Sequence, residues 1–246
     1  VWSTMSKVVA TTVLPEDSGE VLTFGDTGDA IAISGDSLNL NKLQDAGGNN
    51  IITSDGAGNL TINSGLGGAM NLLETNTFTG TTTSNFTTLI DSTYDVYKFV
   101  FININPDTDK PEFQFQCSTD GGSNYNVTMT TTYFISYHNE TGSTSGLDYS
   151  TTFDQAQATS YQTLVQDTGN DADSSGNGEI YLFAPSSTIY IKNFFSTANN
   201  NNGDEYVNNT FIGGYFNTTS AINAISFKMS SGNMDGIIKM YGISKS

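Results

Sequence analysis

Few side chains in this sequence are suited to catalysis, and they do not group into a known catalytic pattern. His138 is the only histidine, and its polar segment SYHNETGS contains neither a cysteine nor an elbow-type serine motif. Hydrolysis of a glycosidic bond requires two carboxyl groups close together, and no pair of Asp or Glu residues stands out. The sequence therefore predicts no catalytic residues and a protein that is not an enzyme.

Cys117 is the only cysteine, so no disulfide forms within one chain. In the segment EFQFQCS it alternates with Phe113 and Phe115, which is the spacing of side chains on one face of a strand. We therefore expect Cys117 to face a core as a small apolar side chain, and not to act as a reactive thiol.

The segment STDGGSNY resembles the Asp-box turn of sialidase-like propellers. Ser118, Asp120, Gly122 and Tyr125 match that pattern, whereas Asn124 stands where threonine is usual. Asp120 can accept backbone N–H bonds inside the turn, and glycine permits positive φ. A propeller needs several copies and a sialidase needs arginines, but the segment occurs once and the chain has no arginine. We therefore predict a structural turn at these residues.

The segment DADSSGNGE begins with the spacing of a calcium-binding loop, because Asp171 and Asp173 stand at its first and third positions. The twelfth position is Leu182 instead of the bidentate glutamate, so an EF-hand is excluded. Two alternatives remain, a solvated acidic loop and an irregular calcium site held by Asp171 and Asp173. No other metal or cofactor is indicated.

Several tyrosines lie near predicted loops, where a flat aromatic ring can cover the apolar face of a sugar. They are candidate residues for binding a glycan or another receptor, and the alternative for each is ordinary packing within a strand. The candidates are Tyr133, Tyr137, Tyr149 and Tyr206, with Tyr161 and Tyr215 in similar positions.

The formal net charge is −17, from 25 acidic residues against 8 lysines. Binding to phosphates requires a basic surface, so nucleic acid is excluded as a partner. No apolar run reaches the length of about 18 residues that a membrane-spanning helix needs, and the first residues lack the apolar segment of a secretory signal. We therefore expect no insertion into a membrane.

The sequence of the first 71 residues predicts two segments, an extended N-terminal arm and a slender β-stem. Residues 1–20 show no periodicity, and we expect an extended arm that is ordered by docking on a larger particle. Residues 21–71 predict a β-stem that ends in a glycine-rich hinge, Ser64 to Asn71. Its five short runs are separated by Gly, Asp or Asn, with starts roughly 8 to 12 residues apart: VLTF, AIAIS, LNLNKL, NIITS and NLTINS.

Residues 72–246 predict a separate domain with longer, aromatic strands and no helical crossover. In YDVYKFVFININ, we expect Tyr97, Phe99 and Phe101 on one face of a strand and Val100, Ile102 and Ile104 on the other. Further strands are expected in EFQFQCS, VTMTTTYFISY, EIYLFA, TIYIKNFF, TFIGGYF, AINAISFKMS and GIIKMYGIS. The predicted fold class is all-β, with a slender N-terminal β-stem followed by an antiparallel, jelly-roll-like β-sandwich.

With this organisation established, the block from Leu72 to Tyr125 resembles a domain of structural proteins of tailed bacteriophages, especially marine ones. The resemblance continues into AINAISFKMSSGNMDGIIKMYGI and covers roughly residues 72 to 246, while ISGDSLNLNKLQDAGGNNIITSDGAGNLTINSG is similar to fibre shafts. It implies a structural protein on the exterior of the virion, commonly trimeric. The implied function is a tail fibre whose distal domain binds the host surface, with a head fibre or capsid decoration (cement) protein as the alternative and a glycan depolymerase as a less favoured one.

The trimer would explain how the predicted stem is covered. Ile51 and Thr53 alternate, as do Leu60 and Ile62, so each short strand has one apolar face. A ribbon of this kind is marginally stable alone. We therefore expect a homotrimer in which identical ribbons cover one another, and contacts to other virion proteins through residues 1–20.

Overall fold

The computed structural model describes residues 42–44, 50–54, 57, 60–62 and 69–244. The chain divides into two compact units, Val1–Ser64 and Gly65–Ser246, which are considered separately. All regular elements in the described ranges are β-strands. Within the same ranges, no helix has the length and apolar character needed to cross a membrane.

The described part of the first unit is a small antiparallel sheet in the order β1-β2-β3. It comprises β1 (Lys42–Gln44), β2 (Asn50–Ser54) and β3 (Leu60–Ile62). Ile52 in the central strand is paired with Leu43 on one side and with Ile62 on the other. The run NIITS coincides with β2, whereas the predicted arm and the runs VLTF and AIAIS lie outside the described residues.

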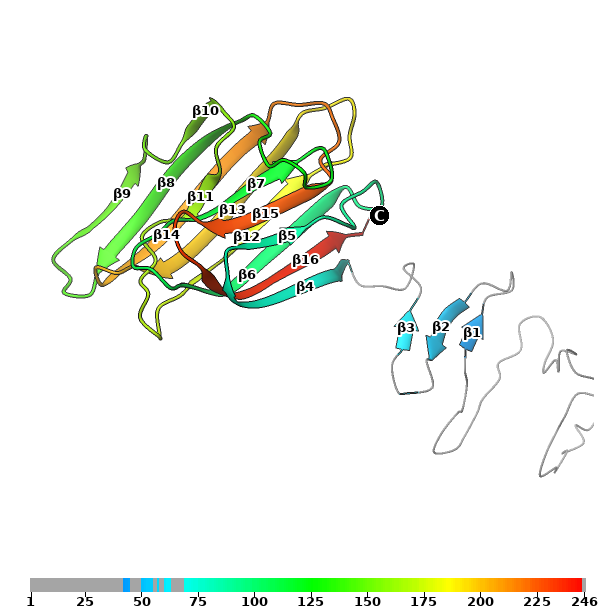
Figure 1. The fold of residues 1–246 in the computed structure, drawn as a ribbon, viewed down its shortest axis with the longest axis horizontal. Coiled ribbons are helices and arrows are strands. Elements are labelled where there is room, and N and C mark those ends of the chain that lie inside the picture. Colours follow the sequence, from blue (N-terminus) through cyan, green and yellow to red (C-terminus); the bar gives the residue numbers. More distant parts are fainter. Residues whose placement is uncertain (1–41, 45–49, 55–56, 58–59, 63–68, 245–246) are drawn as a thin grey trace, which may run out of the picture. The chain divides into compact units, whose positions relative to one another are not determined.

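The second unit is an antiparallel β-sandwich, as the sequence predicts (Figure 1). The larger sheet has nine strands. In spatial order they are β10 (Gln155–Ala158), β8 (Met129–Asn139), β14 (Tyr206–Phe216), β13 (Lys192–Asn201), β12 (Gly176–Phe183), β6 (Val96–Pro106), β16 (Met234–Ile243) and β4 (Met70–Thr81), with β9 (Ser145–Tyr149) also paired to β8. The smaller sheet has the order β11 (Gln162–Val165), β7 (Phe113–Ser118), β15 (Ala224–Met229) and β5 (Thr83–Phe86).

The predicted hinge between stem and sandwich is only partly described. Residues 63–68 lie outside the described ranges, and Met70 and Asn71 form the first two positions of β4. The strand therefore begins before the predicted domain start at residue 72.

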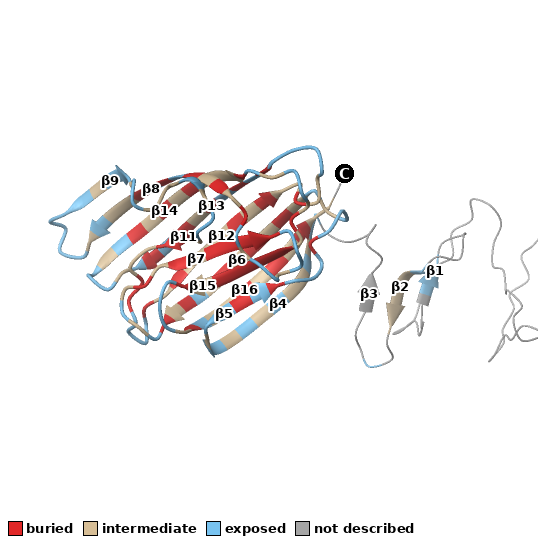
Figure 2. Ribbon diagram, turned by 45° about the horizontal axis from the view of Figure 1, so that its top comes forward, coloured by how far each residue is buried: buried red, intermediate tan, exposed pale blue. Residues whose placement is uncertain are grey.

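The core lies between the two sheets and is rich in phenylalanine (Figure 2). Phe227 of β15 is fully buried and lies 5.7 Å from Phe99 of the larger sheet, measured between ring centroids. It also stacks on Phe113 at 5.9 Å and contacts the rings of Phe86 and Phe115. Cys117 in the neighbouring strand is fully buried, which confirms that it faces the core.

The prediction for the two faces of β6 is correct for one face and partly wrong for the other. Tyr97, Phe99 and Phe101 are fully buried, but Ile104 joins them in the core. Asn103 has a φ of 51°, and the register with neighbouring strands shifts at this point. Because this irregularity adds a residue, Ile104 turns from the outer face to the inner face.

The strand predicted in TIYIKNFF starts later than expected, because β13 begins at Lys192. Ile189 and Tyr190 precede it in a loop, where 74% and 70% of their surface is exposed. Lys192 is fully buried, and its Nζ donates to the carbonyl oxygen of Thr218 at 3.2 Å. Burial lowers the pKa of this ammonium group.

Candidate functional site

A cleft opens where the larger sheet extends past the smaller one. The edge strand β11 lies against β13 and β14, whereas β8 and β9 continue beyond it (Figure 1). The inner face of this overhang is therefore partly uncovered, and it borders a cleft of about 440 Å³. We call it the tyrosine cleft; it is lined by Ile135, Tyr137, residues 148–153, Gln166, Asn202, Tyr206 and Asn208.

Three of the predicted tyrosines meet in this cleft. Tyr137 comes from β8, Tyr149 from the end of β9 and Tyr206 from the start of β14. The Tyr137 hydroxyl donates to Asp148 Oδ2 at 2.8 Å, and its ring lies edge-on to that of Tyr206 at 6.2 Å. The Tyr149 hydroxyl donates to Asp154 Oδ2 at 2.7 Å, and 53% of this residue is exposed.

The other predicted tyrosines are not part of the cleft surface. Tyr133 is fully buried, which favours ordinary packing, the alternative considered for each of these tyrosines. It supports the wall instead, because its ring packs on Phe153 at 5.3 Å. Tyr161 lies beneath Lys228, whose Nζ is 4.5 Å from the ring centroid, and Tyr215 is contacted by the Gln157 amide.

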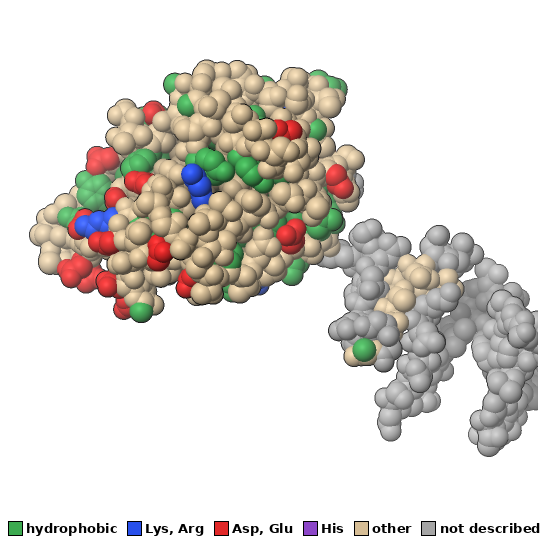
Figure 3. Space-filling view, viewed as in Figure 1, with side chains coloured by type: hydrophobic (Ala, Val, Ile, Leu, Met, Phe, Trp, Pro, Cys, Tyr) green, Lys and Arg blue, Asp and Glu red, His purple; other side chains and the backbone are tan. Residues whose placement is uncertain are grey.

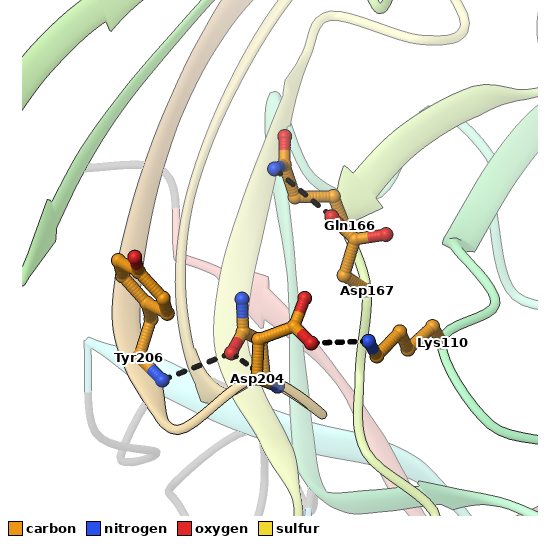
Figure 4. A network of polar contacts seen from close by, with 6 residues as sticks. Lys110, Gln166, Asp167, Asp204 and Tyr206 are labelled. Carbon is orange, nitrogen blue, oxygen red and sulfur yellow. Dashed lines mark hydrogen bonds and ion pairs between the residues drawn. The ribbon is translucent and has the colours of Figure 1, made fainter. Parts of the chain in front are cut away.

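Polar side chains complete the lining, and sequence reasoning did not identify them. Gln166 Oε1 faces the buried Tyr133 hydroxyl at 3.4 Å, and its Nε2 donates to Asp167 Oδ2 at 3.3 Å. Asn202 Oδ1 accepts from the backbone N–H groups of Asp204 and Tyr206, each at 2.9 Å. Figure 4 shows this network, in which Lys110 reaches Asp204. Asn and Gln residues next to predicted loops could have indicated these lining side chains. The chain has so many asparagines, however, that this pattern does not single out particular residues.

One buried polar group in the cleft lining has no hydrogen-bond partner among the described residues. Asn208 lines the cleft with only 2% of its surface exposed. Its Nδ2 is buried and has no hydrogen-bond partner among the described residues. An unsatisfied buried donor costs roughly 1–3 kcal/mol of free energy.

Part of the cleft lies at the end of the sandwich opposite the start of β4. Along the larger sheet, Met70 is aligned with Ile243, Val96 and Phe183 at one end, which we call the entry end. The opposite end, which we call the far end, holds the chain segments that follow β6, β8, β11 and β13. The Tyr206 end of the cleft, with Gln166 and Asn202, belongs to the far end.

The far end is strongly acidic. Figure 3 shows Asp and Glu side chains gathered at the lower left, where β8 ends in Figure 1. The loops there contain a single lysine, Lys110, which pairs with Asp204. Their carboxylates are Asp107, Asp109, Glu112, Glu140, Asp167, Asp171, Asp173, Asp204 and Glu205.

This environment raises several pKa values around the cleft. Burial, with help from Glu112 and Asp204, raises the pKa of Asp167. The hydrogen bond to Asp148 raises the pKa of Tyr137, and the bond to Asp154 does the same for Tyr149. The two phenols therefore stay protonated and remain donors to the carboxylates near neutral pH.

A second hollow, of about 400 Å³, lies on the outer face of the larger sheet, beside Val100 and Ile102. Three of its polar side chains, Asn177, Asn199 and Glu179, already have partners. Asn177 Oδ1 accepts from the Asn103 N–H at 2.8 Å, Asn199 Nδ2 donates to a carbonyl at 2.9 Å, and Glu179 pairs with Lys98 at 2.6 Å. His138 is exposed on β8 and borders a smaller hollow of about 210 Å³. The tyrosine cleft is therefore the stronger candidate for a binding site.

The predicted turn at STDGGSNY follows β7. Ser118 Oγ donates to Asp120 Oδ1 at 2.6 Å and accepts the Gly122 N–H at 3.0 Å. Asp120 also accepts from the backbone and side-chain nitrogens of Asn124, at 2.9 and 2.7 Å. The Tyr125 ring packs against Gly122, where a Cβ would lie 2.7 Å from the phenol oxygen. These five residues close a local turn outside the cleft lining.

The two candidate calcium ligands, Asp171 and Asp173, are exposed in the turn before β12. Within the part of the chain that the structure describes, no three His, Cys, Asp or Glu residues are placed so as to hold a metal ion. Asp171 contributes its backbone carbonyl to Asn105 and Ser174 instead. Among the described residues, no third carboxylate therefore joins this pair.

The fold and the cleft define a β-sandwich with an aromatic, amide-lined cleft that is a candidate binding site. Comparison with known proteins adds no family, since the chain matches no family model, no curated protein and no solved structure.

Proposed function

We propose that this protein is a non-enzymatic structural protein on the exterior of a tailed-bacteriophage particle, and that its sandwich binds a host-surface glycan through the tyrosine cleft. The main support for the binding function is that Tyr137, Tyr149 and Tyr206 line one cleft, together with Asn208. Aromatic faces combined with a few convergent polar groups are typical of sugar-binding sites. The volume of about 440 Å³ is within the range of small-ligand pockets.

The position of the cleft supports a fibre-like role. The far end of the sandwich holds part of the cleft, and the chain enters the unit at the opposite end, where β4 begins. In an appendage, this arrangement presents the site away from the segment that leads to the particle. The resemblance of residues 72 to 246 to virion proteins supports the same proposal.

We also propose that the protein is a homotrimer held together by its first unit. Three strands of three to five residues offer too little surface for independent stability, so copies would cover one another. Three copies of the cleft would give avidity from weak single sites. Sedimentation of the full chain tests this directly, and a species that remains monomeric at micromolar concentration would contradict it.

A glycan array probed with the full chain tests the binding function. We expect binding to a subset of bacterial surface glycans, and a loss of at least tenfold in affinity for Tyr149→Ala and Tyr206→Ala. Tyr190→Ala is the matched control, since Tyr190 is 70% exposed in the loop before β13, at the entry end. Equal losses in all three variants, or no glycan bound at all, would refute the proposal.

Electron microscopy with antibody labelling of particles tests the location. Label at the tail supports a fibre, whereas label over the head supports the decoration alternative. Particles without label would refute both virion roles.

A further inference from the structure

We infer that the tyrosine cleft selects neutral or amino-substituted sugars and excludes carboxylated and sulfated ones. This inference rests on the proposed glycan-binding function and specifies its ligand class. It follows from the charges around the cleft and from the hydrogen-bonding groups that remain unused in its lining.

The charges around the cleft disfavour an anionic ligand. Asp148 contributes a carboxylate to the lining, which contains no lysine, and the protein has no arginine. Lys110, the lysine of the far-end loops, is already paired with Asp204. A carboxylate or sulfate on the ligand would therefore lie near Asp148 without a cation to neutralise it.

In the inferred complex, the buried Asn208 donor binds an oxygen acceptor of the ligand. Asn208 Nδ2 is buried and without a partner among the described residues, and it belongs to the cleft lining. A sugar hydroxyl or an acetamide carbonyl provides an acceptor without adding charge. The ammonium group of an amino sugar has no acceptor lone pair, so a ring hydroxyl of that sugar would accept the hydrogen bond from Asn208.

The unused carboxylate oxygen of Asp148 favours ligands with hydroxyl or ammonium groups. Asp148 Oδ2 accepts the Tyr137 hydroxyl, and no donor among the described residues contacts its Oδ1. A carboxylate oxygen can accept from a sugar hydroxyl or, more strongly, from an ammonium group. In the inferred complex, the Asn208 donor thus pairs with a neutral oxygen of the ligand and the Asp148 acceptor with a neutral or cationic donor.

Titration calorimetry of the full chain with four tetrasaccharides tests the inference. The neutral galactose tetramer is paired with the galacturonate tetramer, and the neutral N-acetylglucosamine tetramer with the cationic glucosamine tetramer. We expect at least one of the neutral or amino tetramers to bind. The affinity for the galacturonate tetramer should be at least tenfold weaker than that for the tightest-binding of the other three. Affinity for the glucosamine tetramer should fall with added salt, since that attraction is electrostatic.

Two variants locate the effect in the cleft. Asp148→Asn removes the charge but can still accept from Tyr137, so the ratio of glucosamine to N-acetylglucosamine affinity should fall at least threefold. Asn208→Leu removes the buried donor and should weaken neutral binding at least tenfold. Asn209→Leu is its matched control, because the next residue of β14 faces the outer side of the sheet. Thermal melting of each variant separates lost binding from lost folding.

The outcomes are distinguishable. Galacturonate binding as tightly as the best other tetramer would overturn the inference while supporting the proposed function. If none of the four tetramers binds at millimolar concentration, the glycan-binding function itself is contradicted. Unchanged neutral binding in a folded Asn208→Leu variant would overturn the role of the buried donor.

Discussion

Gly146 lies directly opposite Tyr137 in the β8–β9 pair, and the tyrosine ring occupies the space that a side chain at position 146 would need. A Cβ atom on Gly146 would lie 2.5 Å from the Tyr137 hydroxyl oxygen and 2.7 Å from its Cζ. Because glycine has no Cβ, the Tyr137 ring can occupy the position from which its hydroxyl donates to Asp148. One wall of the tyrosine cleft depends on this pair.

Gly146→Ala should displace the Tyr137 ring and weaken binding of the array-selected glycan by about 1 kcal/mol, or about fivefold in Kd. Calorimetric titration measures this effect. Gly213→Ala is the control, because a Cβ there would meet only Thr132 Oγ1 at 3.6 Å, an ordinary contact. If both variants bind like the wild type, Tyr137 does not need this position for binding.

Asp120 should titrate at low pH. Its hydrogen bonds with Ser118, followed by those with Asn124, lower the pKa to about 2 from an ordinary value of 3.8. The unfolded chain therefore binds more protons than the folded chain between about pH 2 and pH 4. The contribution of Asp120 to stability is present above pH 4 and is lost as the pH falls toward 2.

Urea unfolding between pH 2 and pH 6 tests this linkage. Asp120→Asn should be less stable than the wild type at pH 6 and should show a smaller loss of stability on acidification. Asp173→Asn serves as control, since Asp173 is exposed and forms no hydrogen bond within the described residues. A carbon NMR titration of Asp120 with a midpoint near 4 would contradict the expected shift.

Phe227→Ala should reduce the free energy of unfolding by about 3–5 kcal/mol, because it removes a fully buried ring from the centre of the core. Phe195→Ala is the matched comparison. Phe195 is 44% exposed on the outer face and stacks on Tyr181 at 4.8 Å, so its loss should cost about 0.5–1.5 kcal/mol. Equal costs for the two variants would show that Phe227 does not have a central role in the core.

Cys117 should not react with a thiol reagent while the protein is folded. The residue is fully buried, and burial raises the pKa of its thiol well above the ordinary range, so little reactive thiolate forms. Ellman's reagent should detect no thiol in native buffer and one thiol per chain in urea. Rapid reaction in native buffer would indicate local opening of β7.

Much of the fold could be predicted from the sequence, because strand formation leaves a local pattern. The alternation of Phe113, Phe115 and Cys117 predicted a strand with one buried face, and these three side chains are fully buried. The run from Asn50 to Ser54 coincides with β2. Period-two alternation depends only on neighbouring residues, so it can be recognised without knowledge of the pairing partners.

Other features could not be predicted because they depend on distant segments. Ile104 was expected on the outer face, but the irregularity at Asn103 turns it into the core, and that irregularity is defined by pairing with β12 and β16. Tyr133 and Tyr137 lie on the same face of β8, yet the first is buried beneath Phe153 and the second lines the cleft. Their burial depends on how far the covering elements extend along the strand.

The sequence by itself determined an acidic, arginine-free, all-β chain with aromatic strands and a group of candidate tyrosines. Only the tertiary structure decided which of these tyrosines share a cleft, since Tyr206 is distant in the chain from Tyr137 and Tyr149 and meets them through the pairing of β8 with β14. The overhang of the larger sheet past β11 leaves that meeting point open, and it brings Gln166 and Asn208 into the same cleft. Strand order and register between distant segments produce this arrangement, and local sequence patterns do not encode them.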